Sequence, residues 1–142
     1  MNGMDGYASH PARDMAIKSV LAVENGERDL WIALFAADGV VQDPVGPSPL
    51  DPSGDGHRGH EAIGAFWDNV IAQGRIHFDV RESYAAGLEC ANVVTITTTF
   101  PNGDKAIVDA VSTYRITDDG QLAALRAFWE FDKLRFEPAP PP

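Results

Sequence analysis

The stretch NVVTITTTFPNGDKAIVDAVSTYRIT, residues 92–117, consists of two strand-forming runs joined by a turn. Val, Ile, Thr and Tyr dominate both runs, and these residue types are enriched in β-strands. The segment between the runs contains Asn102-Gly103, a pair that favours the tight turn of a β-hairpin. The stretch therefore predicts an antiparallel hairpin with strands over 92–100 and 105–117.

Further strand-like runs lie on both sides of this hairpin. Residues 75–84 precede it, and residues 121–134 follow it after the turn residues Asp118-Asp119-Gly120. Both runs are again rich in β-branched and aromatic residues. The second half of the chain is therefore predicted to form a four-stranded antiparallel meander.

The first half of the chain instead repeats apolar residues every three to four positions, which is typical of amphipathic helices. The first predicted helix begins at His10-Pro11, because proline fits the first helical position, and ends at Asn25-Gly26. The remaining predicted elements are a second helix over 27–37, a short strand over 39–43, a Pro- and Gly-rich loop over 44–59 and a third helix over 60–73.

Three helices followed by antiparallel strands indicate an α+β fold, with the helices packed on one face of a curved sheet. Such a sheet, closed by helices on one side, leaves an apolar cone that suits a small ligand. We predict one domain over residues 10–136, a flexible N-terminal arm over 1–9 and a disordered Pro-rich tail over 137–142.

The composition excludes several classes of protein. The 142 residues carry a net charge of −10, which argues against nucleic acid and anionic membranes as partners, since both need a basic surface. Cys90 is the only cysteine, so an internal disulfide and a multi-cysteine metal site are excluded. The first twenty residues lack the apolar run of a signal peptide, and no stretch has the length of a membrane span, so we expect a cytoplasmic protein.

Four segments carry a resemblance to a known family. They are LFAADGVVQDPVG (34–46), GHEAIGAFW (59–67), AVSTYRI (110–116) and LRAFW (125–129). Together they are similar to the ketosteroid isomerases of the nuclear-transport-factor-2-like, or SnoaL-like, superfamily, over most of residues 15–135. The resemblance implies a cone-shaped barrel with a mainly antiparallel mixed sheet. It also implies a homodimer and cofactor-free enzymes, although this superfamily contains binding proteins as well.

The resemblance implies a role for Asp43, which precedes Pro-x-Gly where the family has its general base. A carboxylate there removes a proton beside a ketone carbonyl and returns it two carbons away. The family polarises the carbonyl with a tyrosine and a protonated aspartic acid, but those positions hold Ser19 and Ser112 here. We therefore expect Ser112, Ser19 and Tyr114 to support the carbonyl oxygen, directly or through water. Tyr114 is included because it lies two residues beyond Ser112 on the same strand face.

The predicted pocket wall consists mainly of aromatic residues, each of which could equally be an ordinary core residue. Thr95 is added because it shares a predicted inward strand face with Val93 and Thr97. The predicted wall residues are Phe35, Phe66, Trp67, Thr95 and Trp129. His57 and His60 lie in a Gly-rich stretch without a third ligand, so we expect a solvated loop and no metal site.

The leading hypothesis is therefore a cofactor-free steroid Δ5-isomerase-like enzyme that binds a steroid or similar fused-ring ketone. One alternative is another proton-transfer enzyme on the same scaffold, such as a polyketide cyclase or a dehydratase. The other is a non-catalytic dimer that binds an apolar ligand, which the missing carbonyl-polarising donors favour.

Overall fold

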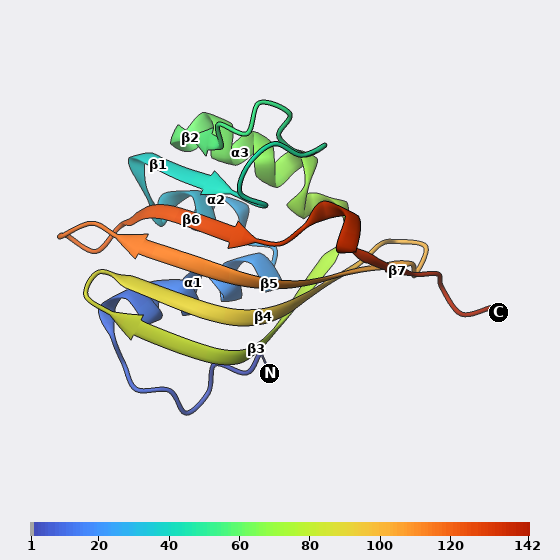
Figure 1. Cartoon of the computed structure of the whole chain (residues 1–142), viewed down its shortest axis with the longest axis horizontal. Coiled ribbons are helices and arrows are strands. Elements are labelled where there is room, and N and C mark those ends of the chain that lie inside the picture. The colour runs from blue at the N-terminus through green and yellow to red at the C-terminus, as the bar shows by residue number, and fades with distance from the viewer. Residues whose placement is uncertain (1) are drawn as a thin grey trace.

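The computed structural model describes residues 2–142 (Figure 1). Three α-helices lie in the first half of the chain, and two short 3₁₀ helices, η1 and η2, follow α3 and β6. The helices are α1 (Pro11–Glu24), α2 (Arg28–Ala33), α3 (Gly59–Asn69), η1 (Ile71–Gln73) and η2 (Phe131–Lys133). The strands are β1 (Phe35–Gln42), β2 (His57–Arg58), β3 (Arg75–Ala86), β4 (Glu89–Thr99), β5 (Lys105–Ile116), β6 (Leu122–Phe128) and β7 (Arg135–Glu137).

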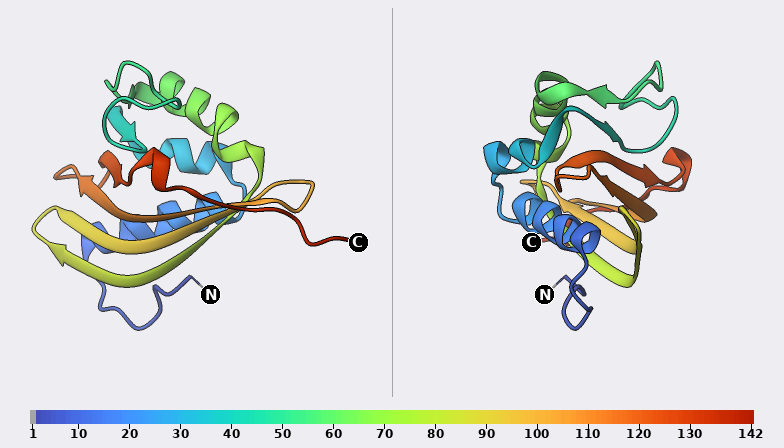
Figure 2. Two further views of the ribbon diagram at one scale, coloured as in Figure 1. Left: turned by 45° about the vertical axis from the view of Figure 1, so that its right-hand side comes forward. Right: turned by 90° about the vertical axis from the view of Figure 1, so that its left-hand side faces the viewer.

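The strands form one curved sheet in the order β2-β1-β6-β5-β4-β3, with β7 added to β5. Only β1 and β6 pair in parallel; the other pairs are antiparallel. Figure 2 shows α1, α2 and α3 together on one side of the sheet. The structure confirms the predicted α+β fold with a mixed, mainly antiparallel sheet. The sheet does not close on itself, since β2 and β3 lie at opposite ends of the strand order.

The core lies between the helices and the concave face of the sheet. Its largest fully buried side chains include Trp31, Phe35, Ile63 and Leu122, none of which is more than 1% exposed. They come from α2, β1, α3 and β6, so the core joins both halves of the chain. Burial of such side chains is the main force that holds the helices on the sheet.

The predicted second helix, over 27–37, is too long. The helix ends at Ala33. Phe35 already belongs to β1, where it pairs with Leu122 of β6. The amide of Leu122 also donates to the carbonyl oxygen of Leu34. The apolar residues at this boundary fit a helix as well as a strand, and a partner far along the chain decides between them.

The last predicted strand, over 121–134, is also wrong in its second half. β6 ends at Phe128, Phe131–Lys133 form a 3₁₀ turn, and the chain returns to pair with β5 as β7. The third predicted helix ends at Asn69, and a separate 3₁₀ turn covers Ile71–Gln73. Both segments become walls of the pocket described below.

The two terminal segments make contacts with the domain. The carbonyl oxygen of Asn2 accepts a hydrogen bond from the Val80 amide, and Met4 is 4% exposed. Near the other end, the amide of Ala139 donates to the Asp104 carboxylate. Within residues 2–142, no helix has the length and apolarity needed to cross a membrane.

Candidate active site

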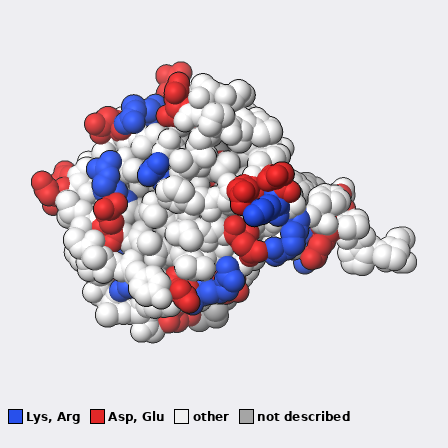
Figure 3. Space-filling model, viewed as in Figure 1, with Lys and Arg blue, Asp and Glu red and all other residues white. Residues whose placement is uncertain are grey.

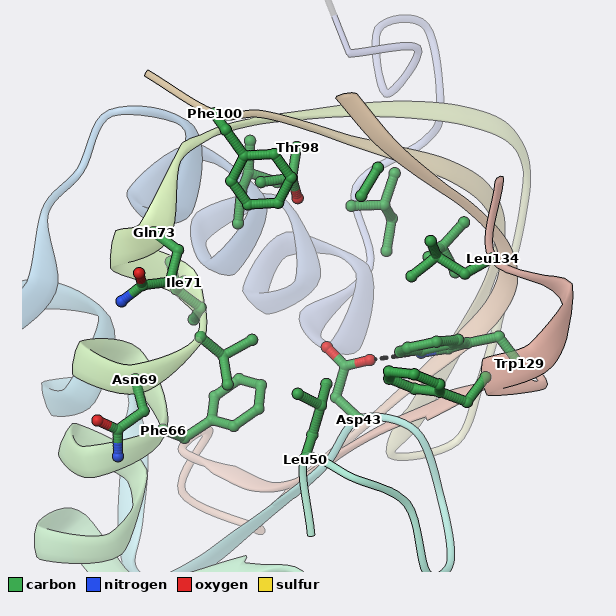
Figure 4. A pocket seen from close by; sticks show the side chains of 16 residues that line it. Asp43, Leu50, Phe66, Asn69, Ile71, Gln73, Thr98, Phe100, Trp129 and Leu134 are labelled. Atoms are coloured by element: carbon green, nitrogen blue, oxygen red, sulfur yellow. Dashed lines mark hydrogen bonds between the residues drawn. The ribbon is translucent and has the colours of Figure 1, made fainter. Parts of the chain in front are cut away.

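Asp43 follows the last residue of β1, at the end of the strand that lies between β2 and β6. The amide of Val45 donates to the carbonyl oxygen of Ala127, 2.9 Å away, and so holds the chain after Asp43 beside the end of β6. Two neighbouring strand ends therefore fix the backbone of Asp43. Its carboxyl group projects between the sheet and α3 (Figure 4).

A tryptophan orients this carboxyl group. Nε1 of Trp129, the first residue after β6, donates a hydrogen bond of 2.6 Å to Oδ1 of Asp43. The Trp129 ring is stacked on Phe131 of η2, with ring centroids 5.7 Å apart, which holds the indole in place. Figure 4 shows the other carboxyl oxygen pointing away from Trp129 into the pocket. One oxygen is thus held and the other is available to a ligand.

The pocket has two chambers that meet at Asp43. The outer chamber has a volume of about 260 Å³ and the inner chamber about 60 Å³. Five residues line both chambers, namely Asp43, Phe66, Ile71, Ile76 and Ile96. Apart from Asp43, these shared residues are apolar, so the carboxyl group lies at the junction of two largely apolar spaces.

Burial raises the pKa of the Asp43 carboxyl group, because removal from water disfavours its charged form. The hydrogen bond from Trp129 and the electrostatic influence of His57 act in the opposite direction. Asp43 keeps a small accessible surface because its free oxygen lines the pocket. A carboxyl group with a raised pKa that faces an apolar cavity is suited to both accepting and returning a proton.

Three predicted polar residues line the inner chamber together with Asp43, namely Ser19, Ser112 and Tyr114. Oγ of Ser19 accepts a 3.0 Å hydrogen bond from Nε1 of Trp31. Ser112 and Tyr114 are both buried. Burial also raises the pKa of Tyr114, so its phenol keeps its proton at neutral pH. The fold thus brings all four residues predicted to be catalytic around one chamber.

Only part of the predicted wall lines the pocket. Phe66 and Trp129 do so. Phe35 and Trp67 are instead core residues that both pack against Trp31, at 5.0 Å and 5.5 Å between ring centroids. They support the wall from behind, since neither side chain lines either chamber.

Thr95 does not lie in the pocket. Its Oγ1 donates to the Asp109 carboxylate, 2.7 Å away on the outer face of the sheet. The inward side chains of β4 are those of Val94 and Ile96 instead. The prediction chose the wrong alternation, and a shift of one residue moves every side chain of a strand to the opposite face.

His57 packs next to the site, contrary to the prediction. It does not lie in a solvated loop but in β2, where it pairs with Val41 of β1, two residues before Asp43. Its ring packs against Phe66 with centroids 4.8 Å apart, and its Nε2 is buried without a hydrogen-bond partner among residues 2–142. Nε2 of the neighbouring His60 donates a hydrogen bond to the carbonyl oxygen of Phe35, 2.8 Å away. A short His-Arg strand gives little sequence signal, so only the pairing with β1 identifies it.

We expect His57→Gln to raise the pKa of Asp43, because the electrostatic influence of His57 lowers that pKa and glutamine carries no charge. A carboxyl ¹³C NMR titration of Asp43 measures this directly. His77→Gln is the matched control, since His77 is exposed and its Nδ1 lies 3.3 Å from Glu24 instead. An unchanged or lower Asp43 pKa in His57→Gln would contradict this electrostatic role.

Comparisons with known proteins agree with this geometry. A family model described as a SnoaL-like domain matches residues 17–125. The steroid Δ-isomerase of Nocardioides simplex is 29% identical over 119 residues, which cover 83% of this chain and 89% of that protein.

Two solved structures have closely similar folds. The Δ5-3-ketosteroid isomerase from a Mycobacterium species superimposes with a TM-score of 0.87 and 36% identity, over 91% of this chain and 100% of that one. RV0760c from Mycobacterium tuberculosis, in complex with estradiol-17β-hemisuccinate, superimposes with a TM-score of 0.85 and 33% identity, over 90% of this chain and 100% of that one.

Proposed function

Because the chain belongs to the SnoaL-like family, as a ketosteroid isomerase-like member, we propose that it shifts a proton between carbons of a 3-ketosteroid or similar fused-ring ketone. The observation that carries this proposal is the Asp43 carboxyl group at the junction of the two chambers, with one oxygen held by Trp129 and the other free. The reaction needs no cofactor, since both proton transfers use this one group.

In the proposed reaction the free oxygen of Asp43 takes a proton from the carbon between the carbonyl and the carbon–carbon double bond. The electron pair of the broken C–H bond forms a new carbon–carbon double bond and the π pair of the carbonyl moves onto its oxygen, which gives a dienolate and a neutral Asp43. The same carboxylic acid then protonates the far end of the dienolate, and the double bond comes into conjugation with the carbonyl. A raised pKa supports the first step, because it makes Asp43 a stronger base than an exposed carboxylate.

The outer chamber supports an apolar fused-ring substrate. Leu50 from the loop after β1, Phe100 after β4 and Leu134 after η2 enclose it (Figure 4). Burial of a rigid ring system against such side chains favours binding without any charged contact. The ring system would then extend outward from Asp43 and the carbonyl would enter the inner chamber.

The test is the conversion of 5-androstene-3,17-dione to its conjugated isomer, which is followed by the rise in ultraviolet absorbance. We expect turnover above the rate in buffer. No turnover above that rate would contradict the proposed isomerase activity.

A second candidate function is binding of an apolar ligand without catalysis. The observation that favours it is the presence of serines at positions 19 and 112, where the resemblance implies stronger donors. Tight steroid binding without conversion, and with no loss of affinity in Asp43→Ala, would support this function over the isomerase.

A second copy of the chain is the proposed protein partner. In Figure 3 the middle of the convex sheet face is largely free of charged side chains, which gather toward its margins. Val111 of β5 and Phe128 of β6 are paired neighbours on this face and are 40% and 43% exposed. Such an apolar patch is typical of a protein–protein interface. Val111→Lys should therefore shift the sedimentation of the protein from dimer to monomer, whereas a monomeric unaltered protein would contradict the proposal.

A further inference from the structure

Two hydroxyl groups of the inner chamber, those of Tyr114 and Ser112, make no hydrogen bond within residues 2–142 and keep some surface that faces the chamber. Tyr114 is 3% exposed and Ser112 is 4% exposed, and both side chains line the chamber that also contains Asp43. Buried polar groups are nearly always paired, because an unpaired one loses its hydrogen bonds to water without replacement. Because both hydroxyls belong to buried side chains and open only to the chamber, a ligand that enters it can supply their missing partner.

The strand geometry directs both hydroxyls to the same place. Ser112 and Tyr114 are two residues apart on β5, so their side chains lie on one face of the sheet. Their partners across the ladder, Ala127 and Leu125 of β6, line the same chamber.

The other two polar residues that line the chamber, Ser19 and Asp43, are less suited to donate to a ligand oxygen. The Ser19 oxygen already accepts the indole N–H of Trp31, so Ser19 offers only its hydroxyl proton. Asp43 lies at the entrance, and none of the residues lining the chamber is Lys, Arg or His. An anionic end of a ligand would meet a carboxylate and no cation there. The chamber is therefore suited to an uncharged oxygen that accepts hydrogen bonds.

We propose that Tyr114 and Ser112 form the donor pair that binds the ketone oxygen of the ligand, with Tyr114 as the main donor. This inference rests on the proposed function, and it deepens that function by naming the groups that polarise the carbonyl and by excluding carboxylate-headed ligands. The phenol donates from β5, not from α1, where Ser19 occupies the donor position that the resemblance implies. In the dienolate the developing negative charge lies on this oxygen, so both hydrogen bonds strengthen during the reaction.

The test compares Tyr114→Phe and Ser112→Ala with Tyr84→Phe, which removes the same hydroxyl from a tyrosine that is 63% exposed on β3. Loss of one donor to a developing oxyanion typically lowers kcat about a hundredfold or more. We expect such a fall in Tyr114→Phe with little change in KM, a smaller fall in Ser112→Ala, and no change in Tyr84→Phe. If kcat in both chamber variants stays within twofold of the unaltered protein, the donor pair is wrong.

A readout that does not depend on turnover separates this inference from the proposed function. Hydrogen bonding to a conjugated ketone moves its ultraviolet absorption to longer wavelength, so bound 4-androstene-3,17-dione reports the donors directly. We expect this shift in the unaltered protein and in Tyr84→Phe, and a smaller shift in Tyr114→Phe. The same shift without turnover would support the donor pair while the isomerase proposal failed. An equal shift in all variants, or no binding of the ketone, would overturn the donor pair.

Discussion

Asp43→Asn is expected to lower kcat for 5-androstene-3,17-dione by about a hundredfold to ten-thousandfold, because positioned general bases typically contribute rate factors of that size. Asparagine has nearly the same shape, and its carbonyl oxygen can still accept the 2.6 Å hydrogen bond of Trp129. It cannot accept the substrate proton. The loss should therefore lie in kcat, with KM little changed, because the apolar walls of both chambers remain intact.

The stability of the same variant provides the control for correct folding. Burial raises the folded-state pKa of Asp43, so the folded protein binds a proton more readily than the unfolded chain. The stability that this proton contributes is fully present below the unfolded pKa and is lost as pH rises through the raised folded pKa. Asparagine carries no charge at any pH, so Asp43→Asn should be more stable than the unaltered protein at neutral pH, and the difference should shrink in acid. Denaturant unfolding at both pH values measures this. Activity equal to that of the unaltered protein in a folded Asp43→Asn would exclude Asp43 as the base.

Trp129→Phe is expected to move the acid limb of the kcat/KM–pH profile to higher pH. Burial raises the pKa of Asp43 and the hydrogen bond from the Trp129 N–H lowers it. Without that hydrogen bond, the pKa of Asp43 should rise further. A hydrogen bond to a charged group contributes about 1.5–3 kcal/mol, so activity on the acidic side of the limb should fall about tenfold to a hundredfold. Phenylalanine still stacks on Phe131, which preserves most of the pocket wall.

The pH profile separates this effect from a merely structural one. A loss of packing alone would lower activity by the same factor at every pH, whereas a change in the pKa of Asp43 spares the alkaline side. Trp67→Phe is the matched control, because it makes the same substitution at a buried tryptophan that contacts Trp31, not Asp43. We expect no displacement of the acid limb in Trp67→Phe. A Trp129→Phe profile that is lowered uniformly would show that the N–H has no influence on the base.

Two groups of residues show why some parts of the site were predictable. Asp43 lies within residues 34–46, one of the segments that carry the family resemblance, and that resemblance singled it out. Ser112 and Tyr114 were placed together by the two-residue repeat of a strand, which is a local property of the backbone. Thr95 follows the same repeat, but the repeat alone does not say which face of the strand is the inner one. The prediction placed Thr95 on the inner face, and the structure places it on the outer face.

The sequence by itself determined the α+β class, the order of helices and meander, and the carboxylate at position 43, because all of these depend on local periodicity and on short motifs. Only the tertiary structure decided the extent of α2 and β6, the return of β7, the contact of His57 with the site and the bond from Trp129 to Asp43. These features join residues far apart in sequence, 86 positions in the case of that bond. Their geometry depends on strand register and on how side chains share the core, and neither is encoded in any single stretch of the chain.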